Sequence, residues 1–174
     1  MDNIQHFSTL FRQLLQVSGL PRIPLKKNEC RTFSGPQCTL CPAIVFDYPD
    51  EVKIKNEAFR QFWKNNNLTG VPEPMIPSPL SRGYRTNSKR RAFRQRDQVL
   101  LGLTDISESG KIRPLDVIQC PIEPEEHSLI YNFLQQYIST RDGRPLAEEL
   151  NYAIIKGSYD EYTVALNIAG ERYK

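Results

Sequence analysis

The chain has 174 residues, of which 23 are lysine or arginine and 20 are aspartate or glutamate, so its formal charge is +3. This length suits one compact domain, with or without an appendage, and is too short for two full-sized domains. The apolar runs are too short for a transmembrane helix, and the N-terminus lacks the basic and apolar stretches of a secretory signal. We therefore expect a soluble, cytoplasmic protein without a membrane partner.

The first half of the chain predicts two helices. Between residues 4 and 17, apolar residues recur every three or four positions, which is typical of an amphipathic helix packed on its own domain. A second helical pattern begins at Pro49 and continues to Trp63, with acidic residues in its first turn. Residues 65–81 contain four prolines and predict an extended connection between two parts of the chain.

From about residue 83 the pattern changes from helix to strand. We expect a strand at 98–103, a turn at 107–110 and a partner strand at 112–118. A helix should follow Cys120-Pro121, and a final hairpin should pair residues 152–156 with residues 162–168. The expected buried face of the helix consists of Ile122, Leu129, Ile130, Phe133, Leu134, Tyr137 and Ile138.

Helices and antiparallel hairpins in separate stretches favour an α+β fold. We expect N-terminal helices and a cysteine loop packed with a small antiparallel β domain, and no Rossmann methyltransferase domain. The expected parts are a helical segment at 1–27, a cysteine-rich loop with a helix and a proline-rich connection at 28–81, and a β domain with one helix at 82–174.

One segment concentrates the positive charge. Between Arg82 and Arg96 the chain carries seven basic residues and no acidic one, which leaves 16 basic and 20 acidic residues elsewhere, a charge of −4. Concentrated positive charge attracts polyanions through counterion release. Tyr84 and Phe93 interleave with these cations, so the pattern favours nucleic-acid binding over a solvated strand face.

Four cysteines form the second notable pattern. Three of them have the spacing C-x7-C-x2-C, and the fourth lies 79 residues further on. In an intracellular protein, thiols with a C-x-x-C core indicate a metal site more often than disulfides. Four thiolates suit either tetrahedral zinc or an iron–sulfur cluster, and the three-plus-one spacing favours the cluster. The candidate ligands are Cys30, Cys38, Cys41 and Cys120.

The order of these motifs resembles the RNA uracil-5 methyltransferase family. The resemblance rests on C…C-x-x-C, then Gly83-Tyr84-Arg85 with Lys89 to Arg91, a Leu-Gly-Leu strand, and Asp116-Val117-Ile118-Gln119-Cys120-Pro121-Ile122. It spans about residues 28–168. The resemblance implies that the four cysteines hold a 4Fe–4S cluster, and that the basic segment opens a central β domain that grips RNA.

The sequence lacks several features that methyl transfer requires. Transfer to uracil C5 needs a thiolate nucleophile, an acidic base and a glycine-rich loop for S-adenosylmethionine. The chain has no G-x-G, all four cysteines are candidate ligands, and His6 and His127 are isolated. We therefore expect no catalytic residues here, and no methyl transfer unless a separate methyltransferase domain or chain is supplied.

We expect the basic segment to bind tRNA or ribosomal RNA, with alternate side chains of a strand facing outward. Two alternatives stay open. One is a small iron–sulfur protein for electron transfer or redox sensing, and the other is a zinc-stabilised nucleic-acid-binding module. The candidate RNA-binding residues are Arg82, Tyr84, Arg85, Lys89, Arg90, Arg91, Phe93, Arg94 and Arg96.

Overall fold

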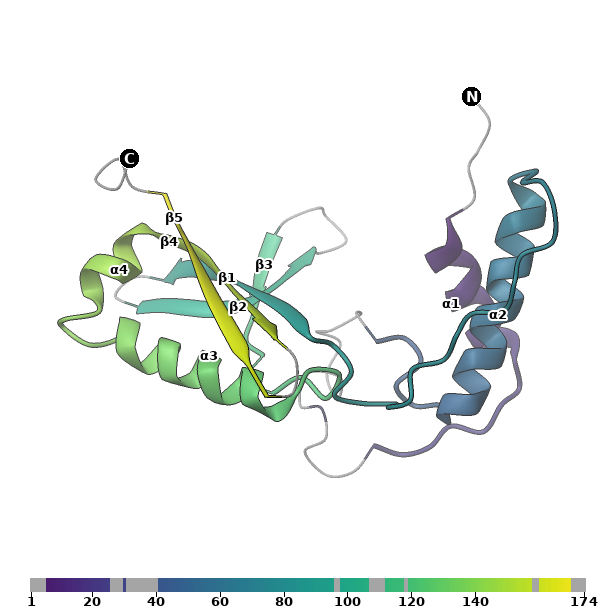
Figure 1. Cartoon of the computed structure of the whole chain (residues 1–174), viewed down its shortest axis with the longest axis horizontal. Coiled ribbons are helices and arrows are strands. Elements are labelled where there is room, and N and C mark those ends of the chain that lie inside the picture. The colour runs from purple at the N-terminus through teal and green to yellow at the C-terminus, as the bar shows by residue number, and fades with distance from the viewer. Residues whose placement is uncertain are drawn as a thin grey trace. The chain divides into compact units, whose positions relative to one another are not determined.

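A computed structural model of the chain describes residues 6–25, 30, 41–95, 98–106, 112–117, 119–157 and 160–169. The chain divides into two compact units (Figure 1). One unit comprises Met1–Asn28 and Thr39–Pro79, and the other comprises Glu29–Cys38 and Leu80–Lys174.

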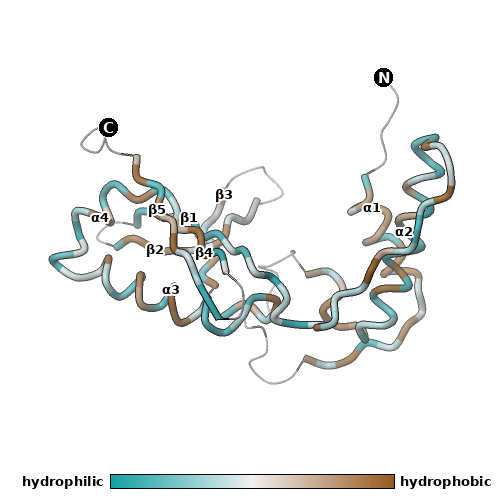
Figure 2. The backbone as a smooth tube through the Cα atoms, in the orientation of Figure 1, coloured by the Kyte–Doolittle hydropathy of each residue, from teal (hydrophilic) through white to brown (hydrophobic). Residues whose placement is uncertain are grey.

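The first unit is built on two helices, α1 (Phe7–Val17) and α2 (Tyr48–Asn65). Their apolar stripes form one core, in which Leu10 and Leu15 of α1 pack with Ile54 and Ala58 of α2. Hydrophobic and hydrophilic residues alternate along both helices, as Figure 2 shows. The side chain of Asp47 caps the N-terminus of α2, and acidic residues occupy its first turn. Both predicted helices are therefore confirmed, although Ile4 lies outside the described residues.

The proline-rich connection runs along α2 without forming a helix or a strand. Two side chains of α2 hold its backbone, because Met75 N donates to Asn56 Oδ1 at 2.7 Å and Ser78 N donates to the Tyr48 hydroxyl at 2.7 Å. The indole of Trp63 donates to the carbonyl oxygens of Thr69 and Gly70. These side chains thus fix an extended segment that prolines keep from becoming helical.

The second unit contains a five-stranded antiparallel sheet. In chain order the strands are β1 (Asn87–Gln95), β2 (Gln98–Ile106), β3 (Ile112–Leu115), β4 (Leu150–Gly157) and β5 (Tyr162–Ile168). Their order across the sheet is β3-β2-β1-β4-β5, and every neighbouring pair is antiparallel. The helices and this sheet confirm the α+β class. The expected final hairpin is confirmed. The expected strands at 98–103 and 112–118 also pair, but through residues 103–106 and 112–115, because β2 is longer and β3 shorter than predicted. The turn at 107–110 lies outside the described residues.

Helix α3 (Glu125–Ile138) packs on one face of the sheet, and the short helix α4 (Arg144–Glu149) follows it (Figure 1). The hydrophobic core lies between α3 and the sheet, where Tyr131 and Ile138 of α3 pack with Ala92 of β1 and Ile155 of β4. We refer to the opposite side of the strands as the open face of the sheet. The sequence pattern did not predict α4.

The predicted buried face of α3 is partly wrong. Leu129 and Phe133 are 62% and 67% exposed, whereas His127 and Tyr131 are buried. The rotation of the helix follows from polar contacts with the sheet that hydrophobic periodicity does not reveal. Gln135 makes two of them, accepting from Leu101 N at 2.7 Å and donating to Val99 O at 2.6 Å. The helix therefore presents a mixed polar and apolar face to the strands.

Candidate nucleic-acid interface

Strand β1 distributes the basic segment over both faces of the sheet. Along it, exposed and buried residues alternate, so that Ser88, Arg90 and Ala92 are buried toward α3 while Lys89 and Arg91 are exposed on the open face. Successive side chains of a strand point to opposite faces, so Phe93 shares the face of Lys89 and Arg91. The expected alternation is therefore present. It leaves Lys89 and Arg91 accessible to a ligand and buries Arg90.

Arg90 is the basic residue that the structure removes from the surface. Its side chain is 1% exposed and forms a bidentate ion pair with Glu123, with Nη1–Oε1 at 3.0 Å and Nη2–Oε2 at 2.7 Å. Its guanidinium also lies 4.6 Å from the centre of the Tyr131 ring. A buried guanidinium with these partners cannot contact a phosphate at the surface, so we correct the expectation that Arg90 binds RNA.

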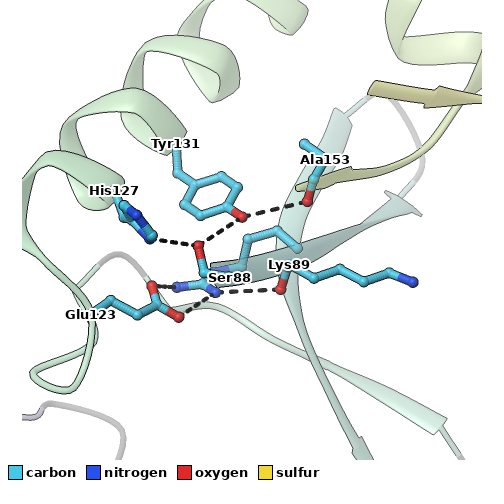
Figure 3. A network of polar contacts seen from close by, with 7 residues as sticks. Ser88, Lys89, Glu123, His127, Tyr131 and Ala153 are labelled. Atoms are coloured by element: carbon cyan, nitrogen blue, oxygen red, sulfur yellow. Dashed lines mark hydrogen bonds and ion pairs between the residues drawn. The ribbon is translucent and has the colours of Figure 1, made fainter. Parts of the chain in front are cut away.

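A separate set of hydrogen bonds lies in the core beside this ion pair (Figure 3). The Tyr131 hydroxyl donates to Ala153 O at 3.4 Å, because a carbonyl oxygen can only accept. Ser88 Oγ then donates to Tyr131 at 3.2 Å, so it accepts the 2.8 Å bond from His127 Nδ1–H. The side chain of Lys89 points away from these contacts, whereas its carbonyl oxygen accepts from Arg90 Nη1 at 3.4 Å.

Burial lowers the pKa of His127 and raises the pKa of Tyr131. The second ring nitrogen of His127 has no hydrogen-bond partner among the described residues, so a proton added there would sit unsatisfied in the core. Although serine and histidine are adjacent here, they are 3% and 0% exposed, and the nearby Glu123 carboxylate binds Arg90. This arrangement stabilises the packing of α3 on β1 and offers no access for a substrate.

The remaining candidates in the basic segment occupy several environments. Arg94 lies on the α3 side of β1, where it donates to the carbonyl oxygens of Glu148 and Leu150. Tyr84 and Arg85 are exposed, and Arg82 is half-buried. Arg96 lies outside the described residues. The basic segment is therefore not one continuous strip, and its open-face part is centred on Lys89 and Arg91.

A groove of about 550 Å³ lies on the open face, over β1, β2 and β4. Lys89 and Arg91 line it together with Tyr152, and the ammonium of Lys89 lies 3.7 Å from the centre of the Tyr152 ring. The strand register places these residues on one face. Arg91 pairs with Tyr152 of β4 on one side and with Gly102 of β2 on the other, and Lys89 lies two residues from Arg91 on the same face of β1. Gly102 and Thr104 of β2 and Asn151 of β4 also line the groove.

Sequence reasoning missed Tyr152 and Asn151. Tyr152 begins the segment predicted as a strand at 152–156, and Asn151 lies just before it. No local signal indicates that this strand pairs with β1, some sixty residues earlier. The run Ala153-Ile154-Ile155 is apolar throughout, so the sequence of β4 does not identify its open face. The identity of its neighbour comes only from the tertiary structure.

Two of the candidate metal ligands occupy similar local structures. Cys41-Pro42 and Cys120-Pro121 each begin a four-residue turn, closed by Ile44 N to Cys41 O at 3.2 Å and by Glu123 N to Cys120 O at 3.0 Å. Proline at the second position fixes the backbone angle that such turns require. Both thiols, like that of Cys30, are half-buried.

The turn after Cys120 is bound to β1 and to the segment that precedes β1. Gly83 N and Arg85 N donate to the carbonyl oxygens of Pro121 and Ile122, both at 2.9 Å, and the last residue of the turn is the ion-pair partner Glu123. Cys38 lies outside the described residues. Among the residues that are described, no three cysteine, histidine, aspartate or glutamate side chains are grouped closely enough to hold a metal ion. Cysteine thiolates are donors that both zinc and iron–sulfur clusters accept.

No protein-family model matches the chain, and no curated protein matches it either. Within the described parts of the chain, no helix is both long enough and apolar enough to cross a membrane.

Proposed function

We propose that the chain is an RNA-binding region that contacts RNA through the open face of its sheet, and that it does not transfer methyl groups by itself. The observation that carries this proposal is the placement of Lys89, Arg91 and Phe93 on one face of β1. The buried ion pair with Glu123 keeps Arg90 on the other face. In the contacts of the described residues, neither Lys89 nor Arg91 forms an ion pair.

Charge supports a polyanionic partner. The chain outside the basic segment carries a formal charge of −4, so a polyanion is attracted to one part of the molecule and repelled by the rest. None of the described residues lining the groove is acidic. A sheet face that combines cations with aromatic rings is a common platform for unpaired RNA bases, which stack on the rings while the cations hold the phosphates. We therefore favour structured RNA with unpaired loops, such as tRNA or ribosomal RNA hairpins.

We further propose that Cys30, Cys38, Cys41 and Cys120 are the ligands of a 4Fe–4S cluster, in keeping with the resemblance to RNA uracil-5 methyltransferases. Cys41 and Cys120 each begin a Cys-Pro turn of the same kind, and this similarity supports a ligand role for both. When bound, such a cluster would cross-link segments of the chain that are distant in sequence. Zinc in the same donor set is the alternative that metal analysis would reveal.

A filter-binding titration tests the RNA proposal. The double variant Lys89→Glu, Arg91→Glu should bind tRNA at least tenfold more weakly than the parent protein at moderate salt. Its plot of log K against log salt should lose about two units of slope, one for each phosphate contact. The matched control is Arg141→Glu, Arg144→Glu, which makes the same charge change at an exposed position before α4 and at the exposed first residue of α4.

The control variant should lose much less affinity than the open-face variant. Equal losses in the two variants would mean that net charge alone governs binding. Weak and equal binding by the parent and the open-face variant would contradict the proposal. In that case, salt-sensitive binding of an acidic redox protein to the parent would favour the electron-transfer alternative.

A further inference from the structure

We propose that the groove on the open face is a subsite for one unpaired ribonucleotide. Its base stacks on Tyr152, and its phosphate is held by Lys89 and Arg91. This inference rests on the proposed RNA binding. It adds the kind of nucleotide that binds, its position in the groove, and contacts from residues outside the basic segment. The subsite would give the protein a preference for looped RNA over fully paired RNA.

The composition of the groove suits a nucleotide. Two cations line it with the neutral polar side chains of Thr104 and Asn151, and no described lining residue is acidic. A phosphodiester would be the counter-ion for two positive charges that no carboxylate in the lining neutralises. The volume of about 550 Å³ is large enough for a single nucleotide and too small for a paired duplex.

Tyr152 provides the stacking surface. The ammonium of Lys89 lies 3.7 Å from the ring centre, so one face of the ring already meets a cation in the groove. A base can occupy that same face when the flexible lysine side chain turns toward the phosphate. Stacking of a base on a tyrosine tolerates every base, so Tyr152 contributes affinity for unpaired nucleotides rather than sequence choice.

The floor and one wall of the groove complete the subsite. At Gly102 a side chain is excluded, because a Cβ atom would lie 2.6 Å from the Leu115 carbonyl oxygen. The backbone of Leu115 therefore fills the space beside Gly102 and closes the groove at this position. On the wall, Asn151 Nδ2 donates to Asn167 Oδ1 at 3.0 Å, which orients the amide. The amide retains an acceptor oxygen and a second N–H, the pair of groups that reads the edge of a base.

The test compares a hairpin RNA carrying 2-aminopurine at one unpaired loop position with a fully paired duplex of equal length. Binding of the parent protein should change the fluorescence of the loop base, because stacking quenches it. The variant Tyr152→Leu should bind the hairpin about tenfold more weakly, with no change in salt slope and little change for the duplex. The control Tyr137→Leu removes an exposed tyrosine from α3 and should behave like the parent.

The outcomes separate this inference from the proposed function. If the parent binds RNA but Tyr152→Leu binds hairpin and duplex as the parent does, the subsite is wrong and the proposed function stands. If the parent binds neither RNA, both proposals fail. Cross-linking of the parent protein to a loop 4-thiouridine avoids any folding defect in the variant. The cross-link should fall on the β4 peptide that contains Tyr152, and a cross-link only to peptides outside the groove would overturn the subsite.

Discussion

The ion pair between Arg90 and Glu123 offers the sharpest prediction about stability. Both side chains are 1% exposed, and two hydrogen bonds of 3.0 and 2.7 Å join them. Glu123→Gln keeps the shape but removes the charge that compensates the guanidinium, and its amide N–H₂ would face the arginine donors. Breaking a buried pair in this way costs about 3–5 kcal/mol, so we expect the free energy of unfolding to fall by that amount.

Urea unfolding followed by circular dichroism measures this change. The double variant Arg90→Met, Glu123→Leu removes both charges and should be less destabilised than Glu123→Gln, because neither charge is left buried alone. The control is the exposed pair of Arg144 and Glu148, whose side chains are 78% and 65% exposed. Glu148→Gln should cost less than about 0.5 kcal/mol. A cost below about 1 kcal/mol for Glu123→Gln would refute the structural role that we assign to the buried pair.

Three further predictions concern the core and the cysteines. Burial lowers the pKa of His127, so the unfolded chain binds this proton more tightly than the folded one. The free energy of unfolding should therefore decrease as the pH falls below about 6.5, by up to about 1.4 kcal/mol per pH unit from this residue, and His127→Gln should show a smaller decrease in parallel urea titrations. Protein purified without oxygen should contain about four iron and four sulfide per chain, and one zinc without sulfide would exclude the cluster. Cys120→Ser should lose the metal and unfold with several kcal/mol less free energy, whereas unchanged metal content and melting temperature would show that Cys120 is not a ligand.

The alternation along β1 could be predicted from the sequence, but its phase could not. Cations occur at both odd and even positions of the strand, so either face could have been the outer one. The choice is made by Glu123, which lies 33 residues away and draws Arg90 into the core. A local pattern carries no information about a partner at that distance.

The rotation of α3 and the position of the groove also depend on residues that are distant in sequence, so the sequence pattern did not predict them. Hydrophobic periodicity assigns Leu129 and Phe133 to the buried face, whereas Gln135 and His127 bind the strands and turn those apolar residues outward. The groove needs Tyr152 beside Lys89, and this contact depends on the pairing of β1 with β4. Local composition therefore predicts the helices and strands, while long-range pairing decides which residues share a surface.

The most direct test of RNA binding by the open face is a map of backbone amide chemical shifts as a tRNA-derived hairpin is added to the isotope-labelled protein. The proposal predicts the largest changes at Lys89, Arg91, Gly102 and Tyr152, with small changes along the exposed side of α3. Changes confined to α1, α2 or α3, or no changes at RNA concentrations that saturate a weak site, would contradict it.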